Sequence, residues 1–211
     1  APKPGNPCRR VFPVTGSAAR DRWEAEYGET GYEPNREATP FLVETLGSEA
    51  PGLALCLAAG AGRNAVYLAT LGWQVTATDI SATGLQWLNR WARECGVDVE
   101  SVVTDLVSWE PGTTCWDLVT MVSYLQPAFF PAIRRALRPG GLFLFHTFGP
   151  KQLEQGWGPR SAAHLAEPET VRSAFQDWEL LRFEEGVFPR GDGRQEGVVR
   201  MLARKPRRPG R

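Results

Sequence analysis

The most constraining feature of the sequence is the stretch LALCLAAGAGRNAVYLATLGWQVTATDIS at residues 53–81. An apolar run leads to a turn with Gly60 and Gly62, a helical pattern follows, and a second apolar run ends at Asp79. This order is typical of a βαβ unit that binds a nucleotide at the turn after its first strand. Because glycine has no Cβ, the backbone at this turn can approach a ligand closely. The stretch therefore predicts a nucleotide site.

The remainder of the chain continues the alternation of strands and helices. Predicted strands cover residues 53–58, 73–78, 97–103, 116–122, 142–148, 178–183 and 198–203; predicted helices cover 63–71, 83–95, 127–137 and 168–175, with a turn at RPGG and an interrupted helical pattern over 21–46. Such alternation predicts an α/β fold with a doubly wound, seven-stranded, mostly parallel sheet. No helix separates the last two strands, so they form an edge hairpin and the last strand is antiparallel.

Length and charge narrow the class of protein further. The 211 residues suit one domain, which we place at 21–206, between a flexible segment at 1–20 and a basic tail at 207–211. The chain has 24 Lys and Arg against 24 Asp and Glu, which gives no case for a nucleic-acid or membrane surface. We find no signal peptide and no apolar run near the roughly 18 residues of a membrane span.

The cysteines and histidines provide little metal chemistry. Cys8, Cys56, Cys95 and Cys115 form no C-x-x-C pair, and the chain has only 2 histidines, so we expect no metal site. The cysteine spacing does not suggest a disulfide framework, and we expect a reducing, cytoplasmic location. The sequence does not indicate an oligomeric state.

Two nucleotide cofactors fit the glycine turn by spacing. The run GAGRNA at residues 60–65 satisfies G-x-G-x-x-G/A, so a nicotinamide dinucleotide remains open. Asp79 can accept hydrogen bonds from the ribose diol of either cofactor. Asp105 follows the third strand, where an adenine amino group needs an acceptor. Together with the antiparallel final hairpin, it favours S-adenosylmethionine.

These motifs resemble the class I S-adenosylmethionine-dependent methyltransferases. The GRN turn followed by Asp79 is most similar to the tellurite-resistance methyltransferase family. DRWEAEY resembles the cofactor-covering helix of that family, and LRPGGLFLFHTF resembles its fifth strand. EPETVRSAFQDWELLRFEE and VVRMLARKP resemble its last helix and hairpin. The resemblance extends over about residues 21–206 and implies a Rossmann-like fold.

The resemblance also implies a set of cofactor-binding residues. Asp79 would bind the ribose, Asp105 and the Leu106 amide would read the adenine edge, and Trp23 and Tyr27 would close over the sulfonium. Plain helix packing is the alternative role of the two aromatic residues. The complete implied set is Trp23, Tyr27, Cys56, Ala58, Gly60, Gly62, Arg63, Asn64, Asp79, Ile80, Asp105, Leu106, Met121 and Val122.

The chain departs from the family pattern at two places. Cys56 stands where members usually carry an acid that helps to hold the ammonium of the cofactor. Burial disfavours a thiolate, and a lost charged hydrogen bond costs about 1.5–3 kcal/mol, so we expect weakened binding or a substitute partner such as a backbone carbonyl. Pro189-Arg190 stands where the tellurite-methylating members carry a His-Arg pair, which argues against tellurite as the acceptor.

The sequence thus predicts an S-adenosylmethionine-dependent methyltransferase that acts on a small-molecule acceptor by in-line transfer. His146 is the candidate catalytic residue, with a hydrogen-bonded structural histidine as the alternative. Arg160, His164 and Arg190 are candidate substrate contacts, with a surface or packing role as the alternative for His164. Two alternatives stay open. One is a methyltransferase-like protein that has lost catalysis and binds a ligand or partner; the other is a nicotinamide-dependent oxidoreductase.

Overall fold

The computed structural model describes residues 18–190 and 192–207. Its strands are β1 (Leu53–Leu57), β2 (Gln74–Asp79), β3 (Val99–Val103), β4 (Trp116–Val122), β5 (Leu137–Phe148), β6 (Glu179–Pro189) and β7 (Gln195–Arg204). Its α-helices are α1 (Ala18–Tyr27), α2 (Pro40–Leu46), α3 (Arg63–Thr70), α4 (Ala82–Glu94), α5 (Phe130–Ala136) and α6 (Pro168–Ala174). Short 3-10 helices lie at η1 (Pro127–Phe129), η2 (Pro150–Gln155) and η3 (Ala162–His164).

All seven strands form one sheet in the order β3-β2-β1-β4-β5-β7-β6. β7 is antiparallel to both of its neighbours, β5 and β6, and the other pairings are parallel. The predicted α/β fold, the class I methyltransferase sheet, is confirmed. A dinucleotide sheet runs 3-2-1-4-5-6, so the inserted antiparallel strand argues against the oxidoreductase alternative. The strand order reverses between β1 and β4, which is where such sheets bind ligands.

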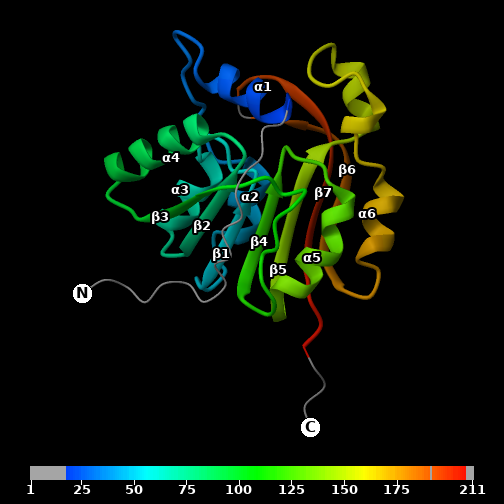
Figure 1. Cartoon of the computed structure of the whole chain (residues 1–211). Coiled ribbons are helices and arrows are strands. Elements are labelled where there is room, and N and C mark those ends of the chain that lie inside the picture. Colours follow the sequence, from blue (N-terminus) through cyan, green and yellow to red (C-terminus); the bar gives the residue numbers. More distant parts are fainter. Residues whose placement is uncertain (1–17, 191, 208–211) are drawn as a thin grey trace, which may run out of the picture.

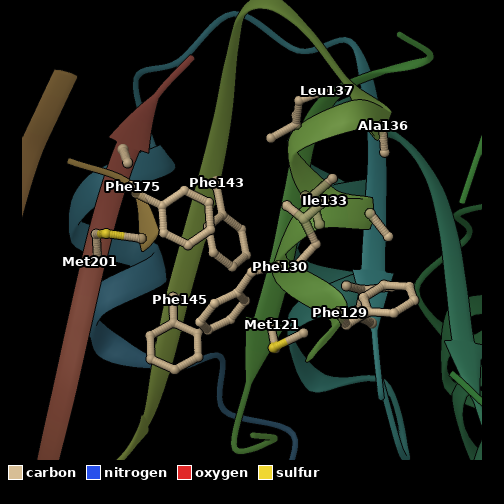
Figure 2. Close-up of a cluster of buried hydrophobic side chains, with 14 of the residues drawn as sticks. Met121, Phe129, Phe130, Ile133, Ala136, Leu137, Phe143, Phe145, Phe175 and Met201 are labelled. Atoms are coloured by element: carbon tan, nitrogen blue, oxygen red, sulfur yellow. The ribbon is translucent and has the colours of Figure 1, made fainter. Parts of the chain in front are cut away.

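Helices cover the sheet on both faces and create two cores. In Figure 1, α3 and α4 lie on one side of the sheet, α5 and α6 lie on the other, and α1 lies across one end. Strand alternation divides the side chains between the faces: Ala54 and Cys56 pack with α2, α3 and α4, whereas Leu55 and Leu57 pack with α5 and α6. Figure 2 shows the second core, which is rich in phenylalanine. The ends of β1 and β4 are thereby fixed from both sides.

The helix boundaries follow the capping residues in the sequence. The Ser81 hydroxyl accepts a hydrogen bond of 3.0 Å from the Gly84 amide and begins α4. The chain turns after α3 at Gly72, whose φ is 92°, a left-handed conformation that glycine adopts without strain. Ser81 therefore caps α4, and Asp79 is left free to face the turn.

Two predicted boundaries were wrong. The final hairpin is longer than expected, because β6 and β7 stay paired as far as Pro189 and Gln195. β6 is an edge strand with one solvated face, so its EEGVF segment lacks the apolar pattern by which we recognised strands. RPGG, the predicted turn, belongs to the start of β5, where the pairing with β4 shifts register.

The ends and the cysteines bring further corrections. Helix α1 already begins at Ala18, inside the segment 1–20 that we expected to be flexible; residues 1–17 and 208–211 lie outside the described residues. Cys115 is disulfide-bonded, which the expectation of no disulfide framework did not anticipate, while Cys56 and Cys95 are free. Cys8 lies outside the described part. The cytoplasmic location rested partly on that expectation and stays a prediction.

Within the described ranges, every helix is too short or too polar to cross a bilayer.

Candidate functional site

A cavity of about 470 Å³ lies at the carboxyl ends of β1 and β4, and residues of α1 line it. This volume falls in the range of small-molecule sites, roughly 300–1,000 Å³. Its walls come from the glycine turn, the ends of four strands, helix α1 and the loop after it. The lining residues are Ala19, Trp23, Glu26, Tyr27, Tyr32, Asn35, Cys56, Leu57, Ala58, Ala59, Gly60, Ala61, Gly62, Arg63, Asn64, Ala65, Asp79, Ile80, Thr104, Asp105, Leu106, Val107, Thr120, Val122, Ser123, Tyr124 and Arg190.

Asp79 is the buried carboxylate of this cavity. One oxygen accepts a hydrogen bond of 2.7 Å from the Gly60 amide, and the other accepts one of 2.9 Å from the Ser81 amide. Burial raises the pKa of the Asp79 carboxyl, whereas these amides favour its ionised form. A carboxylate has about four acceptor positions, so both oxygens keep capacity for a ligand. Asp79 can therefore hold a pair of hydroxyl groups.

The glycine turn is shaped by close contacts as well as by backbone conformation. Gly60 has a φ of 54° and Gly62 a φ of 92°. A Cβ at Gly60 would collide with the Tyr27 hydroxyl, and a Cβ at Gly62 would collide with the Leu88 side chain. Glycine at both positions therefore lets α1 and α4 approach the turn closely.

Two residues other than glycine adopt a left-handed backbone at the cavity. Ala58 follows β1 with a φ of 49°, and Ser123 follows β4 with a φ of 56°. Such a conformation costs on the order of 1–3 kcal/mol and is concentrated at functional sites. Both residues line the cavity, one on each side of the point where the strand order reverses. The strained residues therefore lie at the switch in strand order, where the fold also predicts a ligand site.

Helix α1 covers the cavity through an aromatic cluster. The Trp23 and Tyr27 rings are stacked with centroids 5.8 Å apart, and Tyr32 meets Tyr27 edge-on at 5.5 Å. The Trp87 indole on α4 donates a hydrogen bond of 3.1 Å to the Tyr27 carbonyl. Burial and the charge of Asp79 raise the pKa of the Tyr27 hydroxyl, so it stays a neutral donor. The cluster offers aromatic faces and a hydroxyl to a ligand.

A single carboxylate ties α1 to α4. Glu24 accepts hydrogen bonds of 2.7 Å and 3.1 Å from the Ala82 and Thr83 amides, and one of 3.0 Å from the Ser81 hydroxyl. These groups lie at the start of α4, where amides lack partners within the helix and a negative charge is favoured. Glu24 thus fixes the helix that covers the cavity.

Cys56 contributes a neutral thiol to the cavity. Its side chain is 2 % exposed, and burial raises its pKa to about 12, against a hydrogen bond with Thr120. At neutral pH the thiol cannot replace a carboxylate as the partner of a cation. The sequence-based expectation that burial disfavours the thiolate agrees with this environment.

Two arginines bring positively charged side chains to the lining of the cavity. Arg63 begins α3 and Arg190 follows β6, and both line the cavity. Burial, followed by the charge of Arg190, lowers the pKa of Arg63. The Arg190 guanidinium lies 4.8 Å from the centroid of the Trp157 ring, and its buried Nε lies 3.5 Å from a carboxylate oxygen of Asp192 in a salt bridge.

Most of the predicted site residues do line this one cavity. Trp23, Tyr27, Cys56, Ala58, Gly60, Gly62, Arg63, Asn64, Asp79, Ile80, Asp105, Leu106, Val122 and Arg190 are all brought together there. Met121 is not, because neighbouring strand residues point to opposite faces. Thr120 and Val122 reach the cavity, whereas Met121 packs in the phenylalanine-rich core, as Figure 2 shows. Thr120 is the residue that the sequence reasoning should have named.

The remaining candidates lie away from the cavity lining. His146 is 3 % exposed, and its Nε2 lies 2.9 Å from a carboxylate oxygen of Glu196. The two side chains form a buried pair that is not part of the cavity lining. Arg160 and His164 are exposed in the segment that contains η3. The structure does not bring these three side chains to the cavity, and we do not carry them into the proposals below.

Several lining residues were missed by the sequence reasoning. Glu26, Tyr32 and Asn35 come from α1 and the irregular loop after it, where no periodicity predicts which side chains face inward. Tyr124 follows Ser123 at the end of β4, and burial, followed by the charges of Asp105 and Asp79, raises the pKa of its hydroxyl. Its position after a strand end was the available signal.

The comparisons with known proteins agree with this geometry. A family model for a methyltransferase domain matches residues 54–141, the part of the chain that carries the glycine turn, Asp79 and Asp105. A search of curated proteins returns no significant match.

Three solved structures show the likeness of the fold. One, described as the conversion of a disulfide bond into a thioacetal group during echinomycin biosynthesis, has a TM-score of 0.71 and 18 % identity, over 90 % of this chain and 93 % of that chain. TehB from Haemophilus influenzae has a TM-score of 0.66 and 21 % identity, over 88 % and 66 %. Magnesium protoporphyrin IX methyltransferase from Synechocystis PCC 6803, solved with bound S-adenosylhomocysteine, has 0.62 and 18 %, over 90 % and 94 %.

Fold, cavity and domain match point to one class: the chain has the class I methyltransferase fold, and residues 54–141 match a methyltransferase domain. The domain match, together with a neighbour solved with S-adenosylhomocysteine, is consistent with S-adenosylmethionine as the cofactor, as the sequence predicts. Identities of 18–21 % show the fold and do not distinguish a subfamily.

Proposed function

We propose that this protein is a methyltransferase that moves a methyl group from S-adenosylmethionine to a small-molecule acceptor. The observation that carries the proposal is the position of Asp79, which faces a cavity at the strand switch while the Gly60 amide fixes its carboxylate. Asp79 would hold the ribose hydroxyls. Ile80 and Leu106 supply apolar surface for the adenine, and Asp105 lies beside them as a hydrogen-bond acceptor.

The chain's own residues suit the remaining tasks of methyl transfer. When bound, S-adenosylmethionine supplies an electrophilic methyl group on a sulfonium, which an acceptor nucleophile displaces in line. Trp23 and Tyr27 cover the cavity and present aromatic faces, which favour a cation. Excluding water and positioning the acceptor are the main contributions that such a site makes. Tyr124 stays protonated, so it can donate a hydrogen bond but not act as a base.

The acceptor would enter on the side of Arg190. This residue joins the end of β6 to the cavity and is held beside Trp157. The GRN turn suggests the tellurite-resistance type within the class, and the H. influenzae TehB structure shares the fold at 21 % identity. Because Pro189 replaces the histidine of the family's His-Arg pair, our proposal names a small-molecule acceptor and leaves tellurite as one compound in the screen. The alternative of a binding protein without catalysis has no supporting observation.

Calorimetric titration with S-adenosylhomocysteine and S-adenosylmethionine tests the proposal. We expect micromolar binding by the natural protein and a loss of about tenfold or more in Asp79→Asn, because a charge-assisted hydrogen bond is removed. Asp98→Asn, a change of the same kind outside the cavity lining, is the control. An acceptor screen that measures release of S-adenosylhomocysteine follows. Absence of binding by the natural protein would refute the proposed cofactor, and binding without transfer to any acceptor would refute the proposed activity.

A further inference from the structure

Arg63 is a cavity residue whose charge has no direct partner in the described ranges. Its guanidinium lines the cavity, and burial is the main cause that lowers its pKa. Among residues 18–190 and 192–207 it makes neither a hydrogen bond nor a salt bridge. Glu196 and Asp192 act on it only by longer-range attraction. A desolvated cation without a paired anion is unfavourable, so this position suits an anionic ligand group.

The charges around the turn distinguish between the two ends of an amino acid. Cys56 supplies a thiol that stays neutral far above physiological pH, so it gives an ammonium group no counter-charge. Arg63 adds a positive charge to the same cavity, whereas the Arg190 guanidinium is paired with Asp192 at 3.5 Å. A carboxylate is attracted to this wall, whereas an ammonium group is repelled by it.

The position of Arg63 in the glycine turn indicates which carboxylate it would bind. Arg63 directly follows Gly62 in the turn whose Gly60 amide holds Asp79. The ribose site and the guanidinium therefore belong to the same short segment, at the end of the cavity where the methionine part of the cofactor would lie. Arg190 lies near enough to lower the pKa of Arg63, but its guanidinium is already paired with Asp192 at 3.5 Å.

We propose that Arg63 binds the carboxylate of the cofactor, and that the protein recognises the amino-acid end of the cofactor through this carboxylate more than through the ammonium group. The inference rests on the proposed function and deepens it. It explains how a chain with Cys56 in place of the usual acid retains a cofactor site.

Two analogues of S-adenosylhomocysteine test the inference in the natural protein. S-adenosyl-3-thiopropylamine lacks the carboxylate, and S-adenosyl-4-thiobutyrate lacks the ammonium group. In calorimetric titration we expect loss of the carboxylate to weaken binding about ten- to a hundredfold, and loss of the ammonium group to weaken it by less than about threefold.

Variants assign the effect to Arg63. We expect Arg63→Met to have an affinity for S-adenosylhomocysteine that is about ten- to a hundredfold lower than that of the natural protein. Its affinity for S-adenosyl-3-thiopropylamine should be unchanged. The two proteins and two ligands together form a thermodynamic cycle. Arg63→Lys should retain part of the difference, because it keeps the charge but loses the planar fork. Arg93→Met makes the same change at an exposed residue outside the cavity lining, and it should bind every ligand normally.

The outcomes separate this inference from the proposed function. Equal binding of both analogues, or unchanged binding of S-adenosylhomocysteine by Arg63→Met, would overturn the inference and leave the proposed function standing. Failure of the natural protein to bind any of the adenosyl ligands would overturn the proposed function, and this inference with it. If Arg63→Met does not fold, the analogue comparison in the natural protein decides.

Discussion

Cys56 is the residue at which the cavity can most easily be given a new charge. It lies beside Thr120, is 2 % exposed and lines the cavity. In Cys56→Asp we expect binding of S-adenosylhomocysteine to tighten by about tenfold, because a carboxylate can then pair with the ammonium group. The free energy of unfolding of the ligand-free variant should fall, since its buried charge is unpaired. Calorimetry and thermal unfolding measure the two effects.

Cys56→Ser is the control for this experiment, since it changes the atom without adding a charge. Its affinity for the ligand should remain close to that of the natural protein. If Cys56→Asp and Cys56→Ser bind alike, the thiol does not face the amino-acid end of the cofactor.

Gly62 is the position where a single methyl group should do the most damage to the turn. Its φ of 92° is strained for an L-residue, and a Cβ would also collide with Leu88 on α4. We expect Gly62→Ala to lower the free energy of unfolding by about 2–4 kcal/mol, from backbone strain and overpacking together. Denaturant unfolding measures the loss.

Gly96→Ala provides the matched comparison. Gly96 has a φ of 68°, but a Cβ there meets nothing within 4 Å. This variant should lose only the strain contribution, about 1 kcal/mol. Equal losses in the two variants would show that contact with Leu88 does not constrain the turn.

At the scale of elements, the joint between α1 and α4 should depend on pH. Burial raises the pKa of Glu24, but hydrogen bonds from Thr83, Ala82 and Ser81 outweigh it and lower the pKa overall from its ordinary value of 4.5. The stabilisation is therefore fully present above the pKa of the unfolded chain and is lost as the pH falls through the lower pKa of the folded protein.

Glu24→Gln tests this joint. At pH 7 we expect it to lower the free energy of unfolding by about 1 kcal/mol, as for other helix caps, and to speed hydrogen exchange at the Ala82 and Thr83 amides. The difference from the natural protein should shrink below the ordinary pKa of 4.5, as the natural carboxyl becomes protonated. Glu29→Gln, in the loop after α1, should show no such pH dependence; a difference that persists at low pH would exclude the carboxylate as the cause.

The elements also show what the sequence could and could not reveal. β1 carries a continuous apolar run and β4 a mostly apolar one, so the places of both strands were predicted well. β6 mixes Glu185 with half-buried neighbours at a sheet edge, and its length was missed. Within the site, motif spacing located the turn and Asp79. Strand alternation, which separates Thr120 from Met121, and the irregular loop that brings in Tyr32 depend on tertiary packing.

For the whole molecule, the shared sheet predicts cooperative unfolding. All seven strands, from edge strand β3 to edge strand β6, belong to one sheet with a hydrophobic core on each face. Loss of one core should therefore unfold the other. Ile133→Ala in one core and Leu68→Ala in the other should each lower the free energy of unfolding by about 2–5 kcal/mol. Each should move one common transition, recorded by calorimetry and by near- and far-ultraviolet circular dichroism. Two separated transitions would contradict a single domain over 21–206.

The position of β7 also affects how the chain can fold during synthesis. β7 is the last strand of the described residues, yet it lies between β5 and β6. A ribosome releases β5 and β6 before the strand that joins them. Until residues 195–204 emerge, β5 presents a row of unpaired backbone groups, the kind of edge that recruits other chains. The half of the sheet with the glycine turn can assemble while the chain is still being made, whereas the half with β6 must wait for its final strand.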